Sequence, residues 1–272
     1  MAGVSTEMKH IKSIWMSTVM MALIVATWGL TGTVTQAAPA PGPQGESVNQ
    51  AATGEITGKI LFEGTKPHLP RVDMSKDPEC AREQLGKAVY PPDGRVNSNG
   101  TLPSVFVFAQ SGAGKYHFPT PTRAATLDQK GCVYVPHVLG IMVGQPLKVV
   151  NSDFTTHNIH VMPKDNPSWN QSQPPGGAPF YKKFQHPEIM LPVHCNEHPW
   201  MKAYIGVVAN PFYAVTGKQG TFTIKGIPAG EYTFEAWTST FGTQRKTVTV
   251  QAGKSATVDF TFFQKPVKRL AD

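Results

Sequence analysis

The sequence predicts an all-β protein, and three features of the chain support this class. From Glu55 onward, short apolar stretches with alternating polarity are separated by Gly, Pro, Asn and Asp. These stretches are rich in β-branched and aromatic residues, which favour strands. Almost no helical periodicity accompanies them. Many short strands between Gly and Pro turns indicate β-sandwiches or a barrel.

The N-terminus has the layout of a secretory signal peptide. Lys9 and Lys12 precede an apolar run over residues 14–30, and small residues follow it. We expect residues 1–37 to be removed on export, which places the protein in the periplasm or another exported location. A retained membrane anchor is the alternative, because the apolar run approaches the length that spans a bilayer. Residues 38–54, rich in Pro, Gly, Ala and small polar residues, predict a flexible linker.

Size and charge limit the remaining possibilities. About 220 residues follow the linker, which is enough for one large or two small domains. The chain carries a formal net charge of +7. Its lysines and arginines are scattered and form no recognition motif, so nucleic acid is not an expected partner.

The strands are expected over ten stretches. In chain order these are residues 56–62, 104–109, 132–136, 147–150, 157–161, 203–208, 221–224, 232–237, 246–250 and 257–262.

The last four of these stretches look like part of one module. Residues 220–237, GTFTIKGIPAGEYTFEAW, continue into TVTVQAGKSATVDFTF. This pattern resembles the later strands of the carboxypeptidase regulatory-like, transthyretin-like β-sandwich. The opening strand of that family resembles residues 54–64 and its second strand resembles residues 102–110. The match departs at residues 217–220, where the family usually has acidic turn residues.

The resemblance implies a domain arrangement. Residues 55–116 and 210–264 are expected to form the two parts of this sandwich, followed by a tail over residues 265–272. Residues 117–209 are then a second β-domain inserted into a surface loop, where insertion is structurally cheap. A single larger sandwich with decorated loops is the alternative.

The inserted segment contains a group of residues typical of a metal site. Cys195, His198 and Met201 follow the order Cys-x-x-His-x-x-Met, and His157 lies about forty residues earlier. A thiolate, two imidazoles and a thioether are the ligand set of a mononuclear blue-copper centre. Zinc would not select the methionine. Alternation places Cys195 at the end of a strand, and Met201 begins the next one.

These motifs resemble the cupredoxin family. The spacing in CNEHPWM is similar to the short ligand loop of amicyanin rather than the longer loop of plastocyanin. The resemblance implies a Greek-key β-sandwich that binds one type 1 copper ion through His157, Cys195, His198 and Met201. It also implies that Asn158, next to the first histidine, ties the two ligand loops together. The predicted fold is therefore a cupredoxin-like sandwich inserted into a carboxypeptidase regulatory-like one.

Other interpretations use the same residues. Cys195 and His198 as a catalytic pair lack an orienting third residue and an oxyanion turn. A dinuclear copper site needs a second cysteine in the loop. Glu197 remains a possible additional ligand in a distorted site. The other histidines considered are expected to be ordinary solvated or hydrogen-bonded side chains, namely His137, His160, His186 and His194.

The copper interpretation also bears on the remaining cysteines. The chain has three, and three cannot all pair within one molecule in an oxidising compartment. If Cys195 is the copper thiolate, Cys80 and Cys132 can form a disulfide that joins the outer module to the insert. Two separate buried thiols are the alternative.

The function implied by the resemblance is single-electron transfer without substrate turnover, so an enzyme is not expected. The expected partner is a periplasmic redox protein, a cytochrome, dehydrogenase or oxidase, acting as electron donor or acceptor. His198 is expected near the surface, with Pro167, Pro199 and Trp200 as an apolar rim for docking. A copper-handling protein that exchanges its metal, and an accessory adhesion or scaffold module, are the alternatives.

Overall fold

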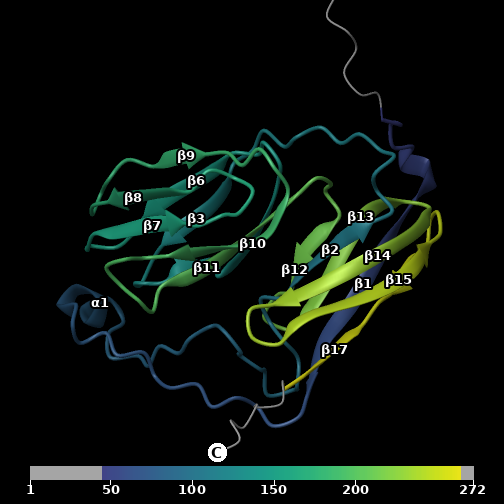
Figure 1. The fold of residues 1–272 in the computed structure, drawn as a ribbon. Coiled ribbons are helices and arrows are strands. Elements are labelled where there is room, and N and C mark those ends of the chain that lie inside the picture. The colour runs from purple at the N-terminus through teal and green to yellow at the C-terminus, as the bar shows by residue number, and fades with distance from the viewer. Residues whose placement is uncertain (1–44, 265–272) are drawn as a thin grey trace, which may run out of the picture. The chain divides into compact units, whose positions relative to one another are not determined.

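The computed structural model describes residues 45–264 (Figure 1). Its elements, in chain order, are the 3-10 helix η1 (Gln50–Ala52), β1 (Thr53–Glu63), α1 (Pro78–Glu83), β2 (Phe106–Ser111), β3 (Ala125–Gln129), β4 (Tyr134–Val135), β5 (Val138–Met142), β6 (Leu147–Asn151), β7 (His157–Val161), β8 (Trp169–Gln173), β9 (Phe180–Lys182), β10 (Glu188–His194), β11 (Lys202–Val208), β12 (Tyr213–Val215), β13 (Thr221–Pro228), β14 (Gly230–Thr238), β15 (Gly242–Val250), β16 (Ser255–Thr257) and β17 (Phe260–Phe263).

The predicted all-β class is confirmed, although the sequence pattern did not predict several of the strands. Strands β8 and β9 carry partly exposed side chains and lie at sheet edges, so they lack a clear apolar alternation. The helix α1 was also missed. Its six residues are too few to show a helical period, although Asp77 as N-cap and Pro78 in the first turn form a start signal.

Strands β3 to β11 form one sandwich of two sheets. The five-stranded sheet has the order β5-β11-β10-β7-β8, and the four-stranded sheet has the order β4-β3-β6-β9. The core between them is apolar and includes Leu127, Val149, Ile159, Val193 and Ile205, all fully or almost fully buried. Burial of these side chains orients the ends of β7 and β10, which carry the candidate metal ligands.

The strands before and after this segment form a second sandwich (Figure 1). One sheet has the order β13-β1-β16, with β17 also paired to β1, and the other has the order β12-β2-β14-β15. Its core is separate from the first and includes Ile56, Phe222, Ile224, Phe234 and Phe260. Phe222 and Ile224 alternate with exposed neighbours, as the sequence predicted, whereas Phe234 lies between the half-buried Thr233 and the buried Glu235.

A third apolar cluster connects strands of the two sandwiches. Phe106 of β2 packs against β5 and β11, where Gly140 and Gly206 are paired across the sheet. A Cβ atom on Gly206 would lie 2.5 Å from the Phe106 ring, and one on Gly140 would lie 2.6 Å from it. The aromatic ring therefore fits against the sheet because both positions lack a side chain.

Part of the segment between β1 and β2 packs against a different sandwich from the one expected. Residues 55–116 were expected to belong to one sandwich, yet Met74 and Cys80 contribute to the core of the other. A disulfide between Cys80 and Cys132, with Cα atoms 5.5 Å apart, connects α1 to that sandwich. Buried apolar area and a covalent bond thus fix a segment that the strand pattern assigned elsewhere.

A flexible linker was expected over residues 38–54, but its described part, residues 45–54, includes backbone pairing, a 3-10 helix and the start of β1. Glu46 exchanges backbone hydrogen bonds with the segment around Tyr116, Asn49 caps η1, and β1 begins at Thr53. Backbone pairing orders these residues despite their polar composition. The expected signal peptide over residues 1–37 and the tail over residues 265–272 lie outside the described residues. No helix within residues 45–264 has the length and apolar character needed to cross a membrane.

Candidate metal centre

The candidate ligands lie where two neighbouring strands and one loop meet. His157 is the first residue of β7, and Cys195 directly follows β10. The two strands are antiparallel neighbours, with Val193 opposite Val161 and His194 opposite His160. The start of β7 is therefore next to the end of β10.

The loop after Cys195 is closed by its own backbone. The Met201 amide donates to the His198 carbonyl at 2.9 Å, and the Cys195 amide donates to the Met201 carbonyl at 3.3 Å. This tight loop turns His198 back over Cys195. Met201 is buried in the same core cluster as Cys195, immediately before β11.

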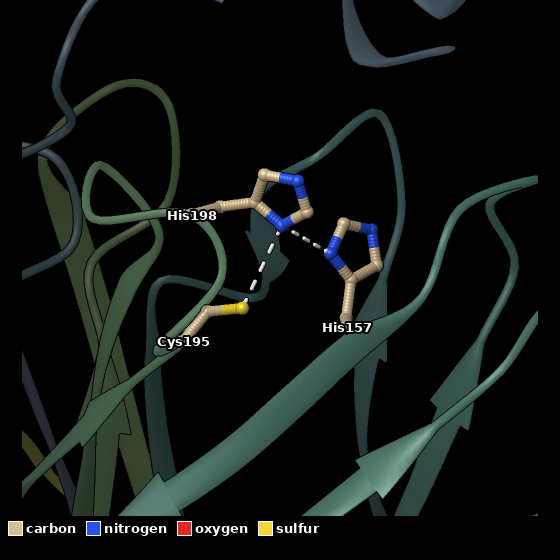
Figure 2. A group of neighbouring side chains, drawn as sticks. All are labelled: His157, Cys195 and His198. Atoms are coloured by element: carbon tan, nitrogen blue, oxygen red, sulfur yellow. Dashed lines mark hydrogen bonds between the residues drawn. The ribbon is translucent and has the colours of Figure 1, made fainter. Parts of the chain in front are cut away.

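Three donor atoms converge at one point, as Figure 2 shows. The Nδ1 atoms of His157 and His198 lie 2.9 Å apart, and Nδ1 of His198 lies 3.6 Å from the Cys195 sulfur. A metal ion with bonds of roughly 2.0–2.3 Å holds adjacent donor atoms roughly 3–4 Å apart. The spacing of this cluster therefore fits a single ion. All three side chains are buried.

Hydrogen bonds also join the two ligand segments through Asn158. Its side-chain oxygen accepts the backbone N–H of Asn196 at 2.5 Å, and its side-chain nitrogen donates to Asn170. Asn196 follows Cys195 directly, so this contact fixes the end of β10 against the start of β7. Asn158 therefore links the segment that carries His157 to the segment that carries Cys195.

The surroundings of Cys195 favour its thiolate form. Burial by itself would raise the pKa of this thiol, but the adjacent His157 and His198 outweigh burial and lower the pKa to about 6. His157 is affected in the opposite sense. Burial would lower its pKa, but Asp153 and the Cys195 sulfur raise it to about 9. A thiolate available near neutral pH is the form that binds soft metal ions.

Two carboxylates on the far sides of the imidazoles were not found from the sequence. Oδ2 of Asp153 lies 2.8 Å from Nε2 of His157, and Oδ2 of Asp77 lies 2.8 Å from Nε2 of His198. Burial opposes ionisation of both carboxyl groups, yet hydrogen bonds from the histidines and from backbone amides hold both pKa values below the usual range. Nothing in the local sequence relates Asp77 to His198, which lies 121 residues away.

His198 is less accessible than expected. Its side chain lies behind Asp77 and the residue is only 4% exposed, because α1 and its N-cap cover the Nε2 edge. A cavity of about 500 Å³ lies beside it, lined in part by Glu197, Pro199 and Trp200. Pro167, expected in the rim, is not among the lining residues. The Trp200 indole N–H donates to the Cys132 carbonyl at 2.9 Å.

The remaining candidates lie outside the cluster of three donor atoms. Glu197 is exposed on the cavity wall and is absent from the groups of potential metal ligands among residues 45–264. His137 is held by Asp93 and by the Lys202 carbonyl, and His160 contacts Asn196. Two further ligand-like groups each include Cys80 or Cys132, whose sulfurs are already bonded to each other.

Comparisons with known proteins give one family match. The model of the carboxypeptidase regulatory-like domain matches residues 199–262, which confirms the expected resemblance for the C-terminal part of the chain. The match begins before residue 210, the expected boundary of that part. No curated protein matches the chain.

Several solved structures resemble part of the chain. A copper-containing nitrite reductase (NirK) from Thermus scotoductus SA-01 is 24% identical over 36% of this chain, with a TM-score of 0.28, and the match spans only 25% of that chain. A purple cupredoxin from Nitrosopumilus maritimus is 22% identical over 30% of this chain and 98% of that chain, with a TM-score of 0.27. The reduced Cu(I) form of an amicyanin mutant at pH 4 is 18% identical over 37% of this chain and 97% of that chain, with a TM-score of 0.29.

Proposed function

We propose that the protein is an exported type 1 copper protein that binds one copper ion and transfers single electrons. The observation that supports this most strongly is the buried convergence of two imidazole Nδ1 atoms on the Cys195 sulfur. Met201, buried next to this loop, completes a thiolate, imidazole and thioether set that suits copper rather than zinc. We assign the ligand roles to His157, Cys195, His198 and Met201.

Copper held by these residues would supply a one-electron couple, through which an electron could pass from a reduced to an oxidised partner protein. The residues of the chain favour this use over catalysis. The three converging side chains and Met201 are all buried in packed surroundings, and the cavity beside His198 lies outside them. A substrate in that cavity would meet the Asp77-covered edge of His198 rather than the converging donor atoms.

A redox protein is the proposed partner, and the cavity beside His198 and Trp200 is the proposed docking position. Trp200 and Pro199 give that wall an apolar part. The ring centroid of Trp200 lies 5.1 Å from that of His198, and both residues line this cavity. Short through-contact paths of this kind suit electron transfer between transiently bound proteins.

Titration with Cu(II) tests the proposal. Purified protein exported to an oxidising compartment should bind one equivalent and develop an intense visible band from sulfur-to-copper charge transfer. His160→Ala is the matched control for His157→Ala, because His160 lies on the same strand outside the cluster. The control should retain the band and His157→Ala should lose most of it. Binding without a visible band would contradict the proposal.

Rapid mixing separates electron transfer from copper handling. The copper-loaded protein should oxidise a reduced cytochrome while retaining its metal. Transfer of copper to a chelating partner together with slow redox exchange would favour the handling alternative.

A further inference from the structure

Each of the two proposed histidine ligands has a carboxylate on the side facing away from Cys195. Figure 2 shows that the Nδ1 atoms point inward while the second ring nitrogens point away from the cluster. These outer nitrogens lie 2.8 Å from Asp153, for His157, and 2.8 Å from Asp77, for His198. An ionised carboxylate can only accept hydrogen bonds, so each Nε2 must carry the proton and donate it.

Both carboxylates are themselves held in fixed positions. Asp77 caps α1, with Oδ1 accepting the amides of Glu79 at 2.8 Å and Cys80 at 3.1 Å. Thr155 donates to its Oδ2 at 3.1 Å. The second oxygen is thereby directed at His198.

Asp153 is fixed from the other half of the disulfide. Its Oδ1 accepts the Gly131 amide at 2.5 Å, and its Oδ2 accepts the Cys132 amide at 2.7 Å. The amides of Cys80 and Cys132 thus each donate to one of the two carboxylates, and the disulfide joins these residues covalently. The disulfide therefore fixes the positions of the two carboxylates relative to each other.

We infer that Asp77 and Asp153 are positioning residues of the metal centre, each holding one imidazole so that Nδ1 is the metal-binding atom. The inference rests on the proposed function. Hydrogen bonding at Nε2 keeps the proton there and leaves the Nδ1 lone pair directed at the cluster. The negative charges also make the imidazoles stronger donors and favour the more highly charged Cu(II) over Cu(I).

The two positions should differ in strength. The Asp153 side chain is 1% exposed, whereas the Asp77 side chain is 20% exposed and is more effectively screened by water. Removing the charge at Asp153 should therefore change the reduction potential more than removing it at Asp77.

Asp77→Asn is the cleaner variant for testing the orienting role. Asparagine is as good an N-cap as aspartate, so its oxygen can keep the two α1 amides. Its NH₂ group would then face Nε2 of His198, and a donor there favours the tautomer with the proton on Nδ1. In the wild-type protein, Oδ1 of Asp153 accepts the Gly131 amide and Oδ2 accepts the Cys132 amide. Asp153→Asn keeps only one of these two acceptor oxygens, so the fold of this variant must be checked by circular dichroism.

The experiment compares Asp77→Asn and Asp153→Asn with Asp93→Asn, a matched control. Asp93 Oδ1 also lies 3.0 Å from a histidine Nε2, that of His137, outside the cluster. Copper affinity, the visible band and the reduction potential are measured on each copper-loaded protein. We expect each test variant to lose about 10- to 100-fold in Cu(II) affinity, as is typical for partners of ligand histidines. A tenfold greater loss for Cu(II) than for Cu(I) raises a one-electron potential by about 59 mV.

The outcomes separate the two proposals. If the wild-type protein binds copper with the visible band, but Asp77→Asn matches Asp93→Asn in affinity and potential, the positioning role of Asp77 is overturned. The same result in folded Asp153→Asn overturns the role of Asp153. If the wild-type protein gives no band at all, the proposed function is wrong, and the inference that rests on it is wrong too.

Discussion

The Nδ1 atoms of His157 and His198 lie 2.9 Å apart at the centre of the cluster, although 41 residues separate them in the chain. Their accessibility from outside differs, because His198 lines the cavity of about 500 Å³ whereas His157 is fully buried. Exogenous imidazole should therefore restore the visible band of His198→Gly but not that of His157→Gly. Absorption titrations of both variants with imidazole measure this. Equal rescue of the two would contradict the predicted difference in access.

Cys195 and Met201 should have separable effects on a bound metal. Cys195→Ser removes the thiolate and should abolish the charge-transfer band while leaving the β-sandwiches folded. Met201→Leu nearly conserves volume in a buried position, so it should cost less than about 1.5 kcal/mol of unfolding free energy. The leucine variant should keep copper and colour with a higher reduction potential, because a thioether donor is lost. An unchanged band in Cys195→Ser would show that this sulfur is not a ligand.

The Cys80–Cys132 disulfide should contribute substantially to stability. It closes a loop with a sequence separation of 52 residues, which corresponds to about 4 kcal/mol in the chain-entropy model. The double variant Cys80→Ala/Cys132→Ala should lose unfolding free energy of this order in urea titrations. Peptide mapping without reductant provides an independent check, since recovery of both residues as free thiols would contradict the disulfide.

The contact of Phe106 with the glycine pair predicts a sensitive position at the junction. Gly206→Ala places a methyl group 2.5 Å from the Phe106 ring, so the ring or the sheet must shift. We expect a loss of about 1–3 kcal/mol in unfolding free energy. Gly217→Ala is the control, because a Cβ there has open space around it. Adding Phe106→Leu to Gly206→Ala should recover part of the loss, and no recovery would argue against the clash.

Asp93 should make stability depend on acid pH. Burial would raise the pKa of this carboxyl, but hydrogen bonds with His137 and Ser239 outweigh burial and hold the pKa below its usual value of 3.8. A carboxyl with a lowered folded-state pKa stabilises the protein above its unfolded-state pKa, and this contribution is lost as pH falls through the folded-state pKa. Asp93→Asn should therefore be less stable than wild type at pH 7, by about 1.5–3 kcal/mol for hydrogen bonds to a charged group. The difference should shrink below about pH 4, as followed by unfolding at each pH. A difference independent of pH would exclude this explanation.

Much of the fold follows from local patterns. The alternation in β1, β13 and β14 reports which side chains face a core, because a strand places successive residues on opposite faces. Edge strands such as β8 were not predicted, because neither of their faces is fully buried. The helix α1 escaped because a single disulfide and its N-cap, rather than an amphipathic period, hold it in place.

For the candidate site, the types and spacing of the four residues can be read directly along the chain. Cys195, His198 and Met201 lie on one short loop, and His157 begins a strand. The sequence therefore indicates which donor atoms the site contains. Their surroundings depend on how distant segments pack against them. Asp77 reaches His198 from a segment 121 residues away, and it covers the imidazole edge that the family resemblance implied would lie near the surface. Such a contact has no local signal, because it depends on where a disulfide-linked helix packs rather than on the spacing of residues along the chain.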